Sequence, residues 1–102
     1  MTDRLSALRA LLDKSPTNAI ARFGLANELS KAGQFDDAAA HYAEYLRQYD
    51  DEGNGWGRYA DALIQLGRLD DARDALRRGI AAADRYGHPG MVEDLQSRLD
   101  DL

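Results

Sequence analysis

The strongest constraint on this chain is an internal repeat with a period of 34 residues, the separation between Gly33 and Gly67. Residues 33–38, GQFDDA in one-letter code, recur at 67–72 as GRLDDA. The same spacing pairs further apolar or small residues: Leu25 with Tyr59, Ala26 with Ala60, Leu29 with Leu63, Tyr42 with Leu76, and Leu46 with Ile80. A period of this length is typical of supersecondary units that stack side by side and bury a continuous core.

Each repeat is predicted to contain two helices. The first carries apolar or small residues at helical spacing on one face: Leu25, Ala26, Leu29 and Ala32. Gly33 follows at the C-terminal end, where a left-handed backbone conformation commonly closes a helix. A second helix opens with Asp36 and Asp37, whose charges suit the positive end of the helix dipole. The 34-residue repeat is therefore a helical hairpin.

Two alanines, Ala38 and Ala72, occupy equivalent positions in the second helix of the two repeats. A small side chain at this point lets the two helices of a hairpin cross closely. The first predicted helix provides a comparison within the chain. Its residue at the equivalent position is Arg4, and no predicted helix precedes it to pack against. We therefore expect Ala38 and Ala72 to be buried at helix crossings.

These features resemble the tetratricopeptide repeat, whose pattern combines a small residue after a leucine, an aromatic residue, and a later alanine within 34 residues. The residues that carry the resemblance are Leu25, Ala26, Leu29, Gly33, Ala38 and Tyr42 in repeat 19–52, and Trp56, Tyr59, Ala60, Leu63, Gly67, Ala72 and Leu76 in repeat 53–86. The sequence departs from the pattern at Arg22, where a large apolar residue is expected. It also departs at Tyr45 and Gly79, where the family has alanine.

The resemblance implies an all-α fold, a right-handed helical-hairpin solenoid of about six helices forming a single domain over residues 1–102. An N-terminal helix over 3–14 forms a half repeat, with Leu5, Leu8, Leu11 and Leu12 on one face. The fifth helix is expected to extend through Arg85 before residues 87–90 interrupt it. A capping helix over 89–102 places Val92, Leu95 and Leu99 in the core only if the register shifts by two residues. The whole resembles small stand-alone bacterial proteins of this family.

Catalytic, metal and cofactor chemistry finds no support in the residues. The chain has no cysteine, and neither His41 nor His88 has a second histidine at the spacing of a zinc site. The acidic residues 50–52 lack the alternating ligands of a calcium loop. Glycines 53, 55 and 57 lack the lysine of a phosphate loop and are expected to loosen the start of a helix. We expect no metal, no cofactor and no enzyme activity.

The charge pattern argues against nucleic acid as a partner, because 13 basic residues are interleaved with 18 acidic ones and the net charge is −5. No apolar run has the length of a membrane span. The N-terminal residues 1–5, MTDRL, do not resemble a signal peptide, so a cytoplasmic protein is expected.

The resemblance implies a binding groove lined by the first helix of each repeat. Its candidate residues are Ile20, Phe23, Asn27 and Ser30 in the first repeat, and Asn54, Gly57, Arg58, Asp61 and Ile64 in the second. Gly57 is expected to leave a notch beside Phe23, and Asp61 to favour a basic group on the partner. An alternative for Phe23 is packing against the N-terminal helix. Family members that grip chaperone tails have lysine at the position of Phe23, so such a tail is not expected.

The function that this resemblance implies is that of a scaffold or adaptor binding a protein or peptide segment in the groove, as a monomer or weak homodimer. One alternative is a structural protein that self-associates through its last helix or through a face containing Tyr42, Tyr45 and Tyr49. A second alternative is an accessory subunit of a larger complex.

Overall fold

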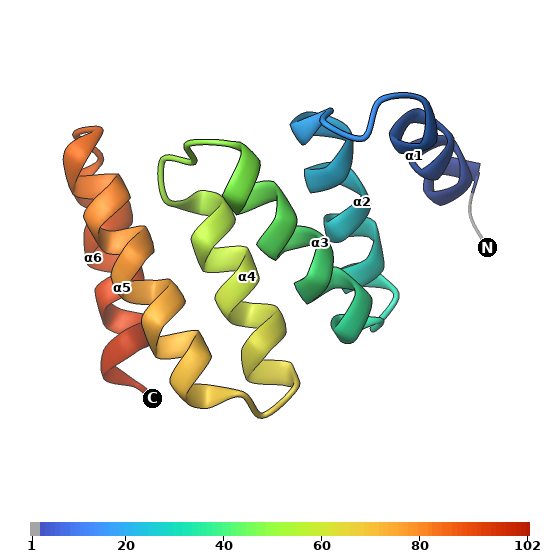
Figure 1. The fold of residues 1–102 in the computed structure, drawn as a ribbon. Coiled ribbons are helices and arrows are strands. Elements are labelled where there is room, and N and C mark those ends of the chain that lie inside the picture. The colour runs from blue at the N-terminus through green and yellow to red at the C-terminus, as the bar shows by residue number, and fades with distance from the viewer. Residues whose placement is uncertain (1–2) are drawn as a thin grey trace.

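The computed structural model describes residues 3–102, and within that range it contains six α-helices and no strand. The helices are α1 (Asp3–Lys14), α2 (Ala19–Lys31), α3 (Phe35–Gln48), α4 (Asn54–Gln65), α5 (Leu69–Arg85) and α6 (Pro89–Asp100). Figure 1 shows them following one another in a row, each helix packed on the next, in a molecule of 37 × 28 × 18 Å. The predicted all-α helical-hairpin solenoid is confirmed.

Both hairpins turn on a glycine with a left-handed backbone, Gly33 at φ 76° and Gly67 at φ 74°. The amide of the next residue then returns to the helix, with Gln34 N donating to Leu29 O at 2.9 Å and Arg68 N to the equivalent carbonyl at 2.9 Å. This geometry satisfies carbonyl groups that a helix end leaves without partners. The C-terminal glycines predicted from the repeat therefore end α2 and α4 as expected.

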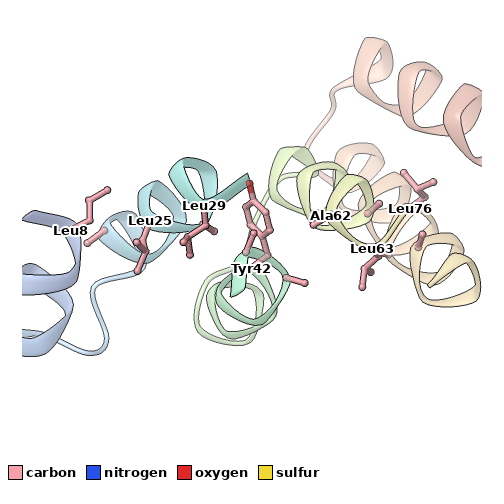
Figure 2. Close-up of a cluster of buried hydrophobic side chains, with 14 of the residues drawn as sticks. Leu8, Leu25, Leu29, Tyr42, Ala62, Leu63 and Leu76 are labelled. Carbon is pink, nitrogen blue, oxygen red and sulfur yellow. The ribbon is translucent and has the colours of Figure 1, made fainter. Parts of the chain in front are cut away.

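The core is a continuous row of side chains that runs along the stack. Figure 2 shows Leu8, Leu25, Leu29, Tyr42, Ala62, Leu63 and Leu76 in this row. Ala38 and Ala72 are both 0% exposed, whereas Arg4 is exposed at the end of the molecule. The expected burial of alanine where helices cross is thus confirmed, and arginine is found where α1 has no earlier helix to pack against.

The end helices close the stack with one apolar side each. α1 buries Leu5, Leu8 and Leu12, but Leu11, which the sequence pattern placed on the same face, is 49% exposed. α5 has 17 residues against 14 for α3, and α6 inserts Leu95, which is 1% exposed. The longer α5 explains why the core register of α6 is shifted relative to the earlier repeats.

The glycines at the start of α4 do not loosen the helix, and that prediction was wrong. A Cβ on Gly55 would lie 2.7 Å from Tyr45 Cε2, and Gly53 and Gly57 have comparably close neighbours. The same turn is held by the buried Asp51, whose Oδ1 accepts hydrogen bonds from Gly53 N at 2.7 Å and Gly55 N at 2.8 Å. Its Oδ2 accepts from the Tyr45 hydroxyl at 2.7 Å. These glycines mark close backbone approaches that fix α4 against α3 and α6.

In residues 3–102, no helix combines the length and apolar character needed to cross a bilayer. Met1 and Thr2, the first two residues of the N-terminal stretch that does not resemble a signal peptide, lie outside the described residues.

Candidate functional site

A pocket of about 310 Å³ opens between α2 and α4, with α3 beneath. Its lining residues are Ser30, Phe35, Tyr42, Arg58, Asp61, Ala62, Ile64 and Gln65, a set called here the α2–α4 pocket. Ser30, Arg58, Asp61 and Ile64 belong to the predicted groove. The remaining four residues were missed. Phe35 and Tyr42 belong to α3, whereas the predicted groove used only the first helix of each repeat, and Ala62 and Gln65 lie on α4 outside the predicted groove positions.

One wall of the α2–α4 pocket is held by hydrogen bonds that involve Tyr42. Its hydroxyl donates to Asn27 Oδ1 at 2.6 Å and accepts from Ser30 Oγ at 3.4 Å. Arg58 Nη1 reaches the same Asn27 oxygen at 3.5 Å. A side chain fixed by several partners presents a constant surface to a ligand, so this wall is preorganised.

Phe23 is half-buried and packs against the tyrosines of α3. Its ring centroid lies 4.7 Å from that of Tyr45 and 6.0 Å from that of Tyr42, the latter edge-on. The guanidinium of Arg58 lies 5.9 Å from the Phe23 centroid. The phenyl ring therefore supports Arg58 beside the pocket.

The notch predicted at Gly57 does not exist, because α6 covers this glycine. A Cβ at Gly57 would lie 3.0 Å from Leu95 Cδ2 and 3.3 Å from Arg98 Nη1. Arg98 donates to Gly57 O at 3.4 Å and to Asp61 Oδ1 at 3.2 Å. The position of α6 depends on the longer α5, which the 34-residue period does not encode.

The remaining predicted residues lie at the N-terminal ends of their helices. Ile20, in the first turn of α2, is 83% exposed, and Asn54, the first residue of α4, is also exposed. Neither is among the residues that line the α2–α4 pocket. The predicted face therefore divides into pocket residues, the supporting side chains of Phe23 and Asn27, and residues at its edges.

The charges of the pocket differ from the expectation. Burial raises the pKa of Asp61, while the neighbouring guanidinium groups of Arg98 and Arg58 oppose the rise. Asp61 forms an ion pair with Arg98 at 3.2 Å, so it is not the free carboxylate that a basic partner group would need. Arg58 forms no ion pair with any carboxylate in the described part of the chain. Arg58 is therefore the charged side chain of the pocket that has no ion pair among the described residues.

No cluster of metal-ligating side chains occurs among residues 3–102. The three acidic residues of the 50–52 turn have separate partners. Asp50 pairs with Arg85 at 2.8 Å, Asp51 is turned inward, and Glu52 pairs with His88 at 2.6 Å. These carboxylates therefore act in packing the turn and do not converge on a common point.

Comparison with known proteins gives two matches. A family model described as tetratricopeptide repeat matches residues 5–57 and, in a second copy, residues 29–88. The chain is also 32% identical over 83 residues to a Pseudomonas aeruginosa protein named TPR repeat-containing protein PA0015. That alignment covers 81% of this chain and 79% of the relative.

Proposed function

Because the chain belongs to the tetratricopeptide repeat family, we propose that it is an adaptor that binds a peptide or protein segment in the α2–α4 pocket. Tetratricopeptide repeats generally mediate protein–protein interactions, and proteins of this family are typically scaffolds without enzyme activity. Two complete repeats over 19–52 and 53–86, with half repeats at either end, would give a single binding domain.

The observation that carries this proposal is the guanidinium of Arg58, which stands beside a preformed pocket without an ion-pair partner among the described residues. Its support on Phe23 and its contact with Asn27 Oδ1 restrict where the charge can move. A group held in this way suits a main-chain carbonyl or an acidic side chain. The partner is therefore expected to be an extended segment that places such an oxygen at Arg58.

The size of the pocket limits what enters it. A volume of about 310 Å³ lies at the small end of ligand sites, which suits one or two side chains better than a folded surface. Ile64, Ala62 and the edge of Phe35 supply apolar contact, while Ser30 and Gln65 supply polar contact. A short apolar side chain next to an acidic or amide group is the chemistry that fits.

The alternative of self-association through a tyrosine face does not agree with the structure. Tyr42 is 1% exposed and Tyr45 is 6% exposed, because both pack beneath α2 and α4. Only Tyr49 of this group is substantially exposed, at 49%. We propose a monomer or weak homodimer acting in the cytoplasm, with the accessory-subunit alternative depending on the partner.

The experiment is a peptide-display selection on the intact chain, followed by affinity measurement on charge-reversed variants. Arg58→Glu should lower the affinity for the selected peptides by about tenfold or more, which corresponds to about 1.4 kcal/mol of binding free energy. Arg77→Glu is the matched control, because Arg77 is an exposed arginine of α5 that does not line the pocket. Equal affinity of the selected peptides for both variants would contradict binding at Arg58.

A further inference from the structure

A second depression lies between α1 and α3, over α2. It has a volume of about 600 Å³ and shares no residue with the α2–α4 pocket. Its lining residues, called here the α1–α3 groove, are Arg9, Leu12, Asp13, Pro16, Arg22, Leu25 and His41. The α1–α3 groove contains Arg22, the residue at which the sequence departs from the repeat pattern.

Arg22 is partly buried and carries its charge without a counter-ion. Its Nη2 donates to Pro16 O at 2.9 Å, and its Nη1 lies 3.1 Å from His41 Nδ1. Arginine can only donate, so His41 accepts at Nδ1 and is a neutral imidazole in this contact. The Nε atom is buried and has no hydrogen-bond partner, and no carboxylate of residues 3–102 forms an ion pair with Arg22.

A buried donor of a charged group without a partner is costly and calls for an explanation. The same groove in the next repeat shows that arginine is not required for the fold. That groove, between α3 and α5, is lined by Leu46, Arg47, Asp50 and Trp56, each 34 residues after Leu12, Asp13, Pro16 and Arg22. The arginines of that second groove have partners within the chain, and the guanidinium of Arg78, for example, lies 5.7 Å from the centroid of the Trp56 ring.

We propose that the α1–α3 groove is an oxyanion site, in which Arg22 binds a carboxylate or phosphate group and Arg9 contributes at the rim. Arg22 lines the groove, no carboxylate of the described residues forms an ion pair with it, and the planar arginine fork matches both kinds of anion. Arg9 is exposed, lines the groove, and forms no ion pair with any described carboxylate.

Acidic groups at the same place limit the affinity. Asp13 of α1 lines the groove, and Asp37 of α3 lies close enough to act on His41. Both are solvent-exposed, so water screens their repulsion more than it screens the attraction of the partly buried Arg22. Removing the Asp13 charge is therefore expected to tighten binding.

His41 provides a reporter beside the site. Burial lowers the pKa of His41, the guanidinium groups of Arg22 and Arg9 lower it further, and Asp37 opposes the change. A bound anion would offset the two arginine charges and raise the pKa of His41 again. His88 lies at the far end of the chain, paired with Glu52, and serves as an internal control.

The experiment follows both histidines by NMR pH titration of the full chain in sodium phosphate and in sodium acetate, with ionic strength held constant by sodium chloride. Phosphate or acetate should raise the pKa of His41 by about half a pH unit or more at saturation, and leave the NMR signals of the His88 ring where they lie in chloride alone. A response to phosphate alone assigns the site to phosphoryl groups. A response to acetate assigns it to carboxylates.

Variants test whether Arg22 is the cause. Arg22→Leu should abolish the response of His41 while the chain stays folded, since an apolar residue fills the equivalent place in the next repeat. Arg9→Gln, an exposed change, should reduce the response, Asp13→Asn should enhance it, and Arg77→Gln should leave it unaltered. Absence of a response in the parent chain, a response in Arg22→Leu, or equal shifts of His88 would overturn the proposal.

Discussion

Replacement of Asp51 by alanine is expected to remove much of the stability of this domain. The Asp51 side chain is buried, and its two oxygens accept three hydrogen bonds, from the Tyr45 hydroxyl and from the amides of Gly53 and Gly55. Alanine would leave all three donors without a partner at the start of α4. The turn could admit water only by separating α4 from α3.

The magnitude follows from these three bonds. A hydrogen bond to a charged group contributes about 1.5–3 kcal/mol, and a buried donor left unsatisfied costs about 1–3 kcal/mol. Because the bonds share one carboxylate, they do not add fully, and a loss of about 3–5 kcal/mol is expected for Asp51→Ala. Domains of this size are stable by about 5–15 kcal/mol, so the variant would be close to unfolding.

Asp51→Asn provides the matched control, since the amide has the same shape. Its oxygen keeps both glycine amides, and its NH₂ group donates to the Tyr45 hydroxyl, which also accepts hydrogen bonds. The cost should fall to about 1 kcal/mol. Urea unfolding followed by circular dichroism and by Trp56 fluorescence measures both variants. An alanine variant within about 1 kcal/mol of the asparagine variant would refute the account of the turn.

Three further changes follow from the packing. Burial and the bond to Asp51 raise the pKa of Tyr45. The stability that Tyr45 contributes is thus fully present below about pH 10, where unfolded tyrosine titrates, and is lost as the pH rises above that value. In the parent chain the urea midpoint should therefore fall at alkaline pH, and Tyr45→Phe should make this fall smaller. Ala72→Leu overfills a fully buried helix crossing and should lower the free energy of unfolding by about 1–3 kcal/mol. A variant that melts at the same temperature as the parent would show that the crossing does not lie at Ala72. Gly57→Leu should lower the free energy of unfolding by a similar amount of about 1–3 kcal/mol, although leucine has the better helix propensity. An unchanged melting temperature in calorimetry would mean that α6 can move away from position 57 without cost.

The helices and their core could be read from the sequence because local rules and the repeat period agree. Gly33 and Gly67 lie at helix ends with left-handed backbones, and Ala38 and Ala72 are fully buried, as their spacing predicts. Leu11 was misplaced because α1 has a packing partner on only one side. A leucine in an end helix is therefore free to face solvent, which periodicity alone does not reveal.

The binding face was harder to predict because it depends on the placement of helices that are distant in sequence. Ser30 and Arg58 come together only when α2 and α4 lie over α3. Gly57 seemed open in the repeat pattern, yet α6 covers it through Leu95. That contact depends on the extra length of α5, and no residue near Gly57 carries a signal for it.

The departures from the repeat pattern separate into compensated and uncompensated ones. Tyr45 is larger than the alanine expected in its place, and its ring occupies space that a side chain on Gly55 would need. Gly79 is smaller than that alanine, and a Cβ there would lie 2.8 Å from Trp56 Cβ. Tyr45 and Gly79 are thus each accommodated by the residue that they face in a neighbouring helix, Gly55 and Trp56 respectively, which preserves the close packing of the interior.

Arg22 is the departure for which residues 3–102 supply no such match. It replaces an apolar residue by a charged one, and its neighbours Pro16 and His41 offer only neutral acceptors. Its Nε remains without a hydrogen-bond partner within that part of the chain. Size differences can be balanced inside the chain by another side chain, but a charge needs an opposite charge or water. The compensation for Arg22 is therefore expected from outside the chain, and this is why the α1–α3 groove, rather than the other departures, indicates a ligand.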